Sequence, residues 1–259
     1  MNASSFSTIS ASGFTVLFGT GLVAGFVDSI AGGGGLITLP VLLSLGLPPK
    51  FALGTNKLQA VFGSTSAAWH YTRSGIVALP ECRRGVLFTL LGAVAGTLVV
   101  QRLNPILLKQ LIPVVLIAIA AYMFLKPQLG EADIRARMKP EKFYLAAGLG
   151  LGFYDGFIGP GTGTFWTMAF MLGLGFNLTK ATGYTKVMNA ASNWISLIFF
   201  AFAAQMYIAA GITMGLGQWL GARFGSHMVV NRGTKFIRPV FLSVVLAVTL
   251  KLLYDDLWK

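Results

Sequence analysis

The sequence predicts an all-α integral membrane protein that crosses the bilayer several times. Of the 259 residues, 55% are hydrophobic and 11% are charged, and the mean hydropathy is +0.72. Because soluble domains carry roughly 25% charged residues, so few charges could not cover a globule of this size in water. Long apolar runs separated by short polar gaps are typical of a polytopic membrane protein.

The charges and the cysteine count exclude several other classes of protein. The net charge is +12, but the basic residues lie between apolar runs and not on one soluble face, which argues against nucleic-acid binding. Cys82, His70 and His227 are too few for a disulfide framework or a metal site, and no cofactor is expected. No basic residue precedes the first apolar run, so we expect that run to be retained and not cleaved as a signal peptide.

The apolar runs predict about eight to ten membrane segments. A helix needs about 20 residues to cross a hydrocarbon core of about 30 Å. Two of the runs are short, since they reach only about 20 to 22 Å at about 1.5 Å per residue. In order, the runs cover 13–31, 34–46, 55–72, 85–101, 106–125, 143–158, 161–175, 186–205, 207–222 and 236–254, and the short ones are 34–46 and 161–175.

A glycine-rich break precedes each short run: Gly32–Gly35 in one case and Gly159-Pro160-Gly161 in the other. Glycine costs a helix about 1 kcal/mol relative to alanine, so neither stretch favours a regular helix. Irregular backbone at membrane depth is tolerated only where protein buries it or where it lines a watery cavity. We therefore expect two broken segments, for which a full crossing and a re-entrant hairpin both fit.

The chain contains two copies of one unit. Three matches occur in the same order at nearly the same spacing: Gly25–Ser29 with Gly152–Gly156, Gly54–Lys57 with Gly183–Lys186, and Lys109–Pro113 with Lys235–Pro239. We therefore divide the chain into a first membrane repeat, 1–126, a charged loop, 127–142, and a second membrane repeat, 143–259. The loop contains Arg135, Arg137 and Lys139, and we expect it to orient the protein rather than to bind a ligand.

The distribution of basic residues favours inverted repeats. If the short run of each half also crosses, 14 of the 20 basic residues fall on one side, which is a positive-inside bias with both termini outside. If the short runs re-enter, the 20 basic residues divide 10 to 10. Small-residue pairs such as Gly21/Gly25 and Gly217/Gly221 predict close helix packing and are compatible with a homo-oligomer.

Two aspartates occupy matching positions four residues before the breaks, Asp28 and Asp155. A charged residue at the centre of a membrane helix costs about 3 kcal/mol or more unless it is paired or hydrated. Two interpretations fit: structural carboxylates that cap a broken helix or pair with a buried lysine, and groups that couple transport to a proton or another ion.

Two lysines also match, Lys57 and Lys186, each in a Gly-x-x-Lys turn that opens a new apolar run. Amide and hydroxyl side chains surround both, and together they form a donor set for an oxyanion. The alternative is that each lysine extends to the membrane interface. The neighbouring polar residues are Thr55, Asn56 and Gln59 in the first repeat, and Thr185, Asn189 and Asn193 in the second.

The breaks supply further donors. A helix that begins at a break exposes unpaired N–H groups and the positive end of its dipole, which is an anion site in transporters with broken helices. We expect two such ends, one at Gly33, Gly34 and Gly35 and one at Gly161 and Thr162. The alternative is that the glycines only permit tight helix crossing.

These motifs resemble the signature of the TauE/SafE sulfite exporter family over essentially the whole chain, and look most like its bacterial inner-membrane transporter branch. The resemblance rests on Gly25–Leu36, Ala52–Gln59 and Gly152–Gly161. It implies the export of sulfur-containing oxyanions such as sulfite, sulfoacetate or related organosulfonates. The second copy departs from the first at Pro160 and Thr162, so we expect the two half-sites not to be equivalent ligands.

We therefore expect a secondary transporter in the bacterial inner membrane, with a small anionic substrate and the lipid bilayer as its partners. A passive anion channel fits the sequence as well, whereas the absence of a Walker A motif argues against an ATP-driven pump. An intramembrane hydrolase would need Ser64 or Ser226 with a histidine, or Asp28 with Asp155, and the paired lysines favour anion binding instead. The predicted substrate-binding residues are Gly33, Gly34, Gly35, Thr55, Asn56, Lys57, Gln59, Gly161, Thr162, Lys186, Asn189 and Asn193, with Asp28 and Asp155 as coupling or structural carboxylates.

Overall fold

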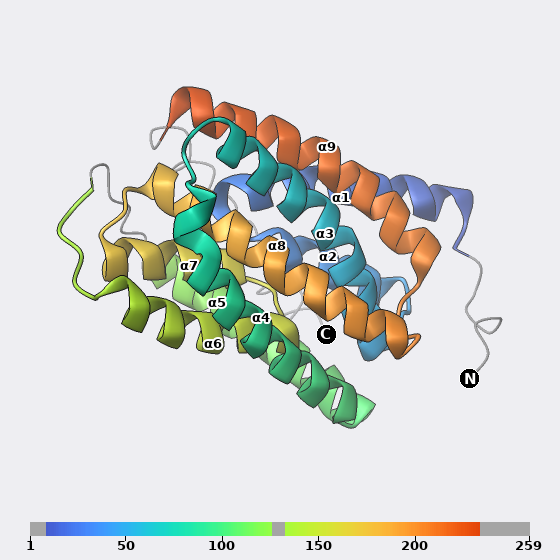
Figure 1. The fold of residues 1–259 in the computed structure, drawn as a ribbon. Helices are drawn as coiled ribbons and strands as arrows, with labels where there is room; N and C mark the ends of the chain where they lie inside the picture. The colour runs from blue at the N-terminus through green and yellow to red at the C-terminus, as the bar shows by residue number, and fades with distance from the viewer. Residues whose placement is uncertain (1–8, 126–132, 234–259) are drawn as a thin grey trace.

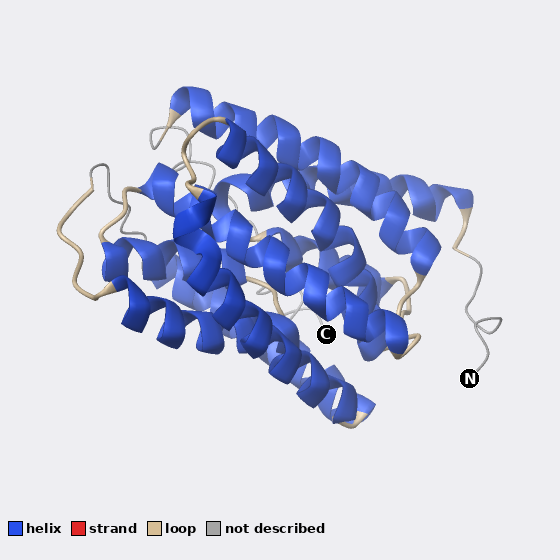
Figure 2. Ribbon diagram, in the orientation of Figure 1, coloured by secondary structure: helices blue, strands red, loops and turns tan. Residues whose placement is uncertain are grey.

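The computed structural model describes residues 9–125 and 133–233, and every regular element in these ranges is a helix (Figures 1 and 2). The predicted all-α class is therefore confirmed. The expected run at 236–254 and residues 127–132 of the charged loop lie outside the described residues. The elements are α1 (Ala11–Ala31), α2 (Gly34–Ser44), α3 (Pro49–Arg73), α4 (Leu79–Arg102), α5 (Pro105–Leu125), α6 (Pro140–Phe157), α7 (Thr162–Ala169), the π-helix η2 (Phe170–Leu174), α8 (Leu178–Phe202) and α9 (Ile208–Arg232).

The helix ends follow from local chemistry. The Ser10 side chain caps α1 by accepting a hydrogen bond from the N–H of Gly13 at 3.2 Å, and Asn177 caps α8 in the same way. Proline begins α3 at Pro49, where its missing N–H costs nothing. α1 ends at Gly32, whose φ of 80° is the left-handed conformation that glycine adopts most readily.

The two halves of the chain pack into one bundle. α1 and α3 of the first half lie along α9 of the second, α4 lies along α6 and α8, and α3 also packs against α8 (Figure 1). The order of elements corresponds in both halves, since a long helix is followed by a short one and then by two long ones. The central elements of the bundle thus come from both halves.

Glycines form the two seams between the halves. In one seam, Gly221 of α9 lies against the carbonyl oxygen of Leu22 in α1, and in the other, Gly92 of α4 lies against that of Leu149 in α6. A Cβ at either glycine would overlap the oxygen, so both seams require the absence of a side chain. The small-residue pairs of the sequence therefore serve helix packing inside the chain.

Contacts between these helices also fix their directions. α1 and α9 run in the same direction, because Gly217 meets Phe18 and, further along both helices, Gly225 meets Phe26.

α3 and α8 run in opposite directions. Gly54 near the start of α3 contacts Phe200 near the end of α8, whereas Tyr71 near the end of α3 contacts Gly183 near the start of α8.

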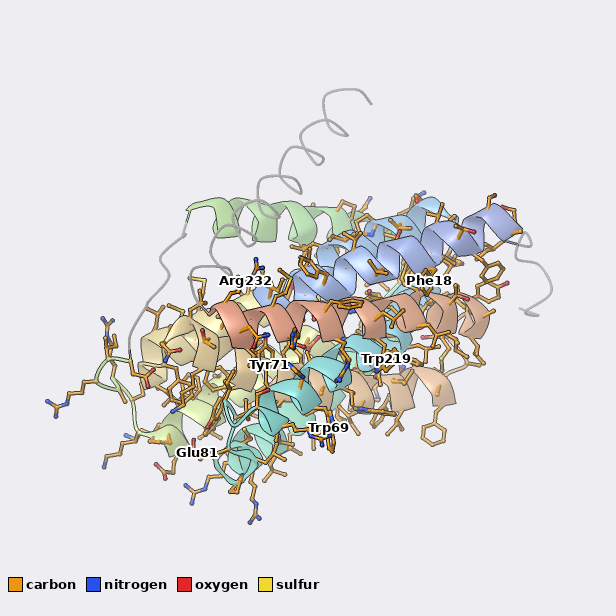
Figure 3. All side chains as sticks on the ribbon, turned by 90° about the horizontal axis from the view of Figure 1, so that it is seen from above. Phe18, Trp69, Tyr71, Glu81, Trp219 and Arg232 are labelled. Atoms are coloured by element: carbon orange, nitrogen blue, oxygen red, sulfur yellow. The ribbon has the colours of Figure 1, made fainter. Side chains whose placement is uncertain are left out.

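Many large apolar side chains point outward, including Trp69, Phe202 and Phe224, which are 63%, 86% and 62% exposed. Within the described ranges, α1 and α4 are both long enough and apolar enough to cross a membrane by length and composition. α3, α8 and α9 have 25 residues each, and their polar residues include many that are buried. Figure 3 shows Glu81 toward one end of the molecule and Phe18 toward the other.

The interior contains two apolar clusters, one around Leu39 and Phe200 and one around Trp166 and Phe170. Polar side chains of α3 and α8 are buried as well. Lys57 and Lys186 belong to the largest fully buried side chains of the described residues. Because lysine is almost never fully buried unless it is paired, these two positions mark the candidate site.

Candidate anion-binding site

Two ion pairs connect the two halves of the chain at the centre of the bundle. Lys57 of α3 pairs with Asp155 of α6 at 2.6 Å, and Lys186 of α8 pairs with Asp28 of α1 at 3.0 Å. The predicted aspartates and lysines therefore meet, and each lysine pairs with the aspartate of the other half. The four formal charges sum to zero within the site.

The Lys57 pair is enclosed by polar partners. Its ammonium donates to Oδ1 of Asp155, to the backbone carbonyl of the same residue at 2.5 Å and to Oδ1 of Asn193 at 3.2 Å. The second carboxylate oxygen of Asp155 accepts a short hydrogen bond from the Ser192 hydroxyl. All three N–H groups of Lys57 and both oxygens of Asp155 thus have partners, as buried charges require.

The Asp28 pair has fewer partners. Oδ2 of Asp28 accepts from Lys186, and Oδ1 accepts from the backbone N–H of Gly34 at the start of α2, at 3.2 Å. The carboxylate therefore occupies one N–H group that was expected to bind the substrate. The Asp28 side chain is 14% exposed, compared with 5% for Asp155.

The two broken segments touch each other beside these pairs. A Cβ on Gly32 would overlap the backbone of Gly163 and Thr164, and the Thr164 hydroxyl donates to the carbonyl of Ala31 at 3.0 Å. Gly161 has a φ of 80° and precedes α7, in the left-handed conformation that glycine tolerates. The glycines therefore allow close approach and also end and begin helices at the site.

Amide side chains form a network on one side of the centre. Asn56 of α3 accepts from the Thr38 hydroxyl of α2 at 2.6 Å and from the Gln59 amide at 2.9 Å. The carboxamide oxygens of Gln59, Asn189 and Gln218 are buried without a hydrogen-bond partner among the described residues. Buried amides of this kind mark a place where a ligand or water completes the bonding.

A small cavity of about 30 Å³ lies at this junction, which is room for a few water molecules at most, since one water needs about 10–15 Å³ of such a cavity. Its lining combines both breaks, both aspartates and the amides of α3 and α8. Ten of the predicted site residues line it: Asp28, Gly35, Asn56, Lys57, Gln59, Asp155, Gly161, Thr162, Asn189 and Asn193.

Four predicted residues are not part of the lining. Gly33 and Gly34 lie at the start of α2, where the Gly34 N–H is bound to Asp28. The hydroxyl of Thr55 accepts from the backbone N–H of Tyr207 at 2.8 Å, so it joins α3 to the start of α9. Lys186 is 0% exposed and its ammonium contacts Asp28, which itself lines the cavity.

Two interpretations of the lysines are corrected by the structure. Gly54–Lys57 and Gly183–Lys186 are not turns, because both lie inside α3 and α8, which begin earlier, at Pro49 and Leu178. Gly54 and Gly183 are needed because neighbouring atoms leave no room for a side chain. A Cβ at Gly54, for example, would overlap the carbonyl oxygen of Gln205. Neither lysine extends to the membrane interface, since both are buried and paired.

Sequence reasoning missed Gln218, Ser192 and Thr38. Gln218 of α9 lines the cavity, and its side chain lies against Gly63 of α3. It has no glutamine counterpart in the first repeat, because Thr89 occupies the corresponding position: Gly25 packs on Gln218 as Gly152 packs on Thr89. The internal duplication was therefore unable to reveal it.

The serine residues considered for a hydrolase do not form a catalytic arrangement. The hydroxyls of Ser64 and Ser226 donate to carbonyl groups of their own helices, Ala60 and Ala222, both at 2.7 Å. Asp28 and Asp155 are each paired with a lysine and are not paired with each other. No group of three His, Cys, Asp or Glu side chains that could hold a metal ion occurs within 9–125 and 133–233.

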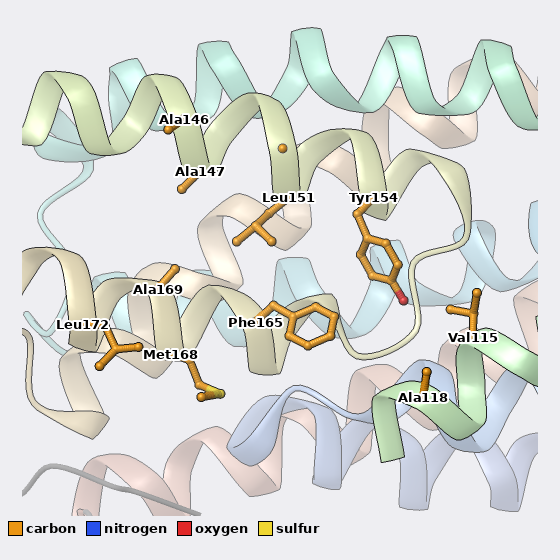
Figure 4. A pocket seen from close by; sticks show the side chains of 11 residues that line it. Val115, Ala118, Ala146, Ala147, Leu151, Tyr154, Phe165, Met168, Ala169 and Leu172 are labelled. Atoms are coloured by element: carbon orange, nitrogen blue, oxygen red, sulfur yellow. The ribbon is translucent and has the colours of Figure 1, made fainter. Parts of the chain in front are cut away.

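A larger cavity of about 730 Å³ lies between α5, α6 and α7 (Figure 4). Its lining is apolar apart from Tyr154, whose hydroxyl donates to the carbonyl of Pro160 at 2.6 Å. An anion would find no charged partner there. The small polar cavity is therefore the candidate site, despite the difference in size.

Comparison with known proteins identifies the family. The profile of the family described as "Sulfite exporter TauE/SafE" matches residues 17–252. The chain belongs to the TauE/SafE family. The predicted resemblance is thereby confirmed, and with it a membrane protein of the transporter class.

Relatives from several bacteria match almost the whole length of this chain. "Probable membrane transporter protein YfcA" of Escherichia coli strain K12 is 45% identical over 241 residues, which cover 93% of this chain and 90% of the relative. A "Probable membrane transporter protein" of Haemophilus influenzae is 42% identical over 243 residues, covering 94% and 95%. YunE of Bacillus subtilis, with the same description, is 22% identical over 274 residues, covering 95% and 99%. No solved structure matches the chain.

Proposed function

We propose that this TauE/SafE protein is a secondary transporter that exports small sulfur-containing oxyanions, such as sulfite or an organosulfonate, across the bacterial cytoplasmic membrane. The observation that carries the proposal is the meeting of two buried lysine–aspartate pairs where two broken helices touch. Ionisable groups buried in a membrane bundle are expensive and typically mark substrate or ion pathways. The family description supplies the sulfur chemistry of the substrate.

The donors around the cavity suit an oxyanion. Asn56, Asn189 and Asn193 line the cavity together with residues of both breaks, and Asp28 in the same lining holds the ammonium group of Lys186. An ammonium group and amide N–H groups bind oxyanions through charge-assisted hydrogen bonds, which are about twice as strong as neutral ones. Because the Lys186 ammonium is held by the Asp28 carboxylate, an anion that binds this lysine must compete with that aspartate for its place. That competition provides a means to control binding.

Inverted repeats are the second part of the proposal. α3 and α8 occupy the same place in the two halves and run in opposite directions, which is the relation expected of repeats with inverted topology. α4 and α6 begin at the same end of the bundle, where Arg84 pairs with Glu141 at 2.6 Å. Arg73 and Arg83 lie at that end too, and the positive-inside rule assigns it to the cytoplasm.

The size of the cavity requires the bundle to change shape during transport. A cavity of about 30 Å³ is smaller than a sulfonate, which has at least five heavy atoms. The bundle must therefore rearrange to admit its substrate, and movement of one repeat against the other would expose the site to each side in turn.

The test is counterflow in proteoliposomes with sulfite, thiosulfate and sulfoacetate. Unlabelled anion inside the vesicles should accelerate the entry of the labelled anion, and uptake should saturate, because a carrier returns faster when it is loaded. Protein-free vesicles and vesicles with a heat-denatured sample are the controls. Uptake that does not saturate and gains nothing from internal anion would indicate a channel. No uptake of any oxyanion would contradict the proposed function.

A further inference from the structure

The two ion pairs of the site differ in how firmly they are held. Lys57 uses three acceptors, and Asp155 accepts from Lys57 and from Ser192. Lys186, in contrast, has Asp28 as its one hydrogen-bond partner among the described residues, although its ammonium has three N–H groups. The Lys186–Asp28 pair is therefore the one that can be exchanged at lower cost.

The difference originates in the sequence of the two repeats. Ser192 lies six residues after Lys186, and the residue six positions after Lys57 is Gly63, which has no side chain. At two further positions α8 carries an asparagine where α3 carries a smaller side chain. Asn189 corresponds in the sequence to Ala60, and Asn193 corresponds to Ser64. Two side chains of α8 thus complete the first pair, since Ser192 donates to Asp155 and Asn193 accepts from Lys57, whereas α3 supplies no hydroxyl for Asp28.

Asp28 lies between the cavity and Lys186. Asp28 lines the cavity, whereas Lys186 is fully buried and is not part of the lining. Of the four charged side chains, that of Asp28 is the most exposed, at 14%. A ligand in the cavity therefore meets the Asp28 carboxylate, which contacts the Lys186 ammonium.

We propose that Lys186 binds the substrate anion and that Asp28 couples this binding to a proton, whereas Lys57 and Asp155 form a fixed structural pair. The inference rests on the proposed transport function and names its coupling ion. A proton from the aqueous side adds to the Asp28 carboxylate, the ion pair with Lys186 is lost, and the anion takes the carboxylate's place on the ammonium.

The charges then fix the stoichiometry. The four groups sum to zero before the step, to +1 when Asp28 is protonated, and to zero again when a monovalent anion binds Lys186. One proton therefore accompanies each monovalent anion, and the loaded site is as neutral as the empty one. Transport of a monovalent anion is then independent of the membrane potential, and its direction is set by the combined concentration gradients of the anion and the proton.

Few other groups face Asp28. Lys186 reaches it from α8 and the Gly34 N–H from α2, and the Tyr71 hydroxyl of α3 binds the neighbouring carbonyl of Ser29 at 2.8 Å. Lys57 and Asp155 share the cavity with it but bind each other. Gln218 is the side chain of α9 in the cavity lining and is neutral. Protonation of Asp28 therefore leaves Lys186 as the site's uncompensated charge.

The experiment measures uptake of methanesulfonate, which keeps a single negative charge at every pH of the assay, into proteoliposomes. The pH gradient and a potassium–valinomycin potential are varied separately. Wild-type uptake should increase when the outside is acid and should not respond to the potential. Asp28→Asn leaves Lys186 permanently positive, so its uptake should lose the pH drive and increase with an inside-positive potential. The matched variant Asp155→Asn should keep the pH drive and the indifference to potential in the protein that remains folded.

Stability provides a second readout, because Asp155→Asn should lower the melting temperature more than Asp28→Asn does. If Asp28→Asn does not fold, the double variant Asp28→Asn/Lys186→Gln restores neutrality and should fold without saturable uptake. The proposal is overturned if Asp28→Asn keeps a pH-driven, potential-independent uptake, if Asp155→Asn acquires the potential response instead, or if the double variant still takes up anion. If the wild-type protein moves no oxyanion at all, the proposed transport function is wrong. If Asp155→Asn and Asp28→Asn lower the melting temperature equally, the difference between the two ion pairs is disproved separately.

Discussion

The ammonium nitrogen of Lys57 lies 2.6 Å from Oδ1 of Asp155, although the two residues are 98 positions apart and belong to different repeats. The matching residues Lys186 and Asp28 form the reciprocal pair at 3.0 Å. Neither repeat can satisfy its own charges in this arrangement. The halves are therefore held together by the groups that also form the candidate site.

Removing one member of the buried pair should destabilise the protein strongly. Lys57→Met leaves the Asp155 carboxylate buried without its cation, which costs about 3–5 kcal/mol in comparable pairs. Thermal unfolding in detergent measures the loss, and Lys57→Met/Asp155→Leu should recover most of it. Arg84→Met is the control, because its pair with Glu141 is exposed at 63% and 60%, and its melting temperature should not change measurably. Equal losses in the two single variants would contradict the structure.

The glycine seams should tolerate no side chain. Gly221→Ala places a methyl group on the carbonyl oxygen of Leu22 and should push α9 away from α1, with loss of folded protein. The control is Gly19→Ala, because Gly19 belongs to α1 of the same seam but an added Cβ there would meet nothing within 4 Å. It should leave stability unchanged or raise it by up to about 1 kcal/mol, since alanine is the better helix former. Size-exclusion profiles and melting temperatures compare the two, and a neutral Gly221→Ala would refute the seam.

Gln218 should contribute to transport and not to stability. Its buried Oε1 has no partner among the described residues, so Gln218→Leu removes an unsatisfied polar atom and should not lower the melting temperature. Because the side chain lines the cavity, counterflow of the anion should decrease by tenfold or more, about 1.4 kcal/mol of lost interaction. Gln205→Leu is the matched control, with the same kind of buried oxygen away from the cavity, and should retain transport. Equal rates in the two variants would remove Gln218 from the site.

Cysteine labelling tests the orientation of the bundle. Cys82 is buried and is the single cysteine of the chain, so Cys82→Ser provides the background. Ser74→Cys and Ala136→Cys are exposed at the end that carries the basic residues, whereas Ala203→Cys is exposed at the end of α8. A membrane-impermeant maleimide should label the first two in inverted vesicles and the third in intact cells. Labelling of all three from one side would rule out the proposed topology.

Several features of the site were predictable because they depend on local composition. Low charge and long apolar runs predicted the helical membrane class, and the duplication predicted matching positions for Asp28 and Asp155 and for Lys57 and Lys186. The start of α3 at Pro49 was not predicted, because its first turns contain polar residues that are buried against other helices. Hydropathy assigns such residues to a loop unless their burial is known.

The sequence by itself determined the helical class and the charged residues that the bilayer would make costly to leave unpaired, and it predicted two repeats, each with a broken segment. Only the tertiary structure decided the partners: that Lys57 meets Asp155 and Lys186 meets Asp28, that Gln218 enters the site from α9, and that Thr55 faces Tyr207 instead. Periodicity and repetition describe neighbours along the chain, whereas an ion pair depends on which helices pack together. That choice is made by the glycine seams, where two backbones approach more closely than any side chain would allow.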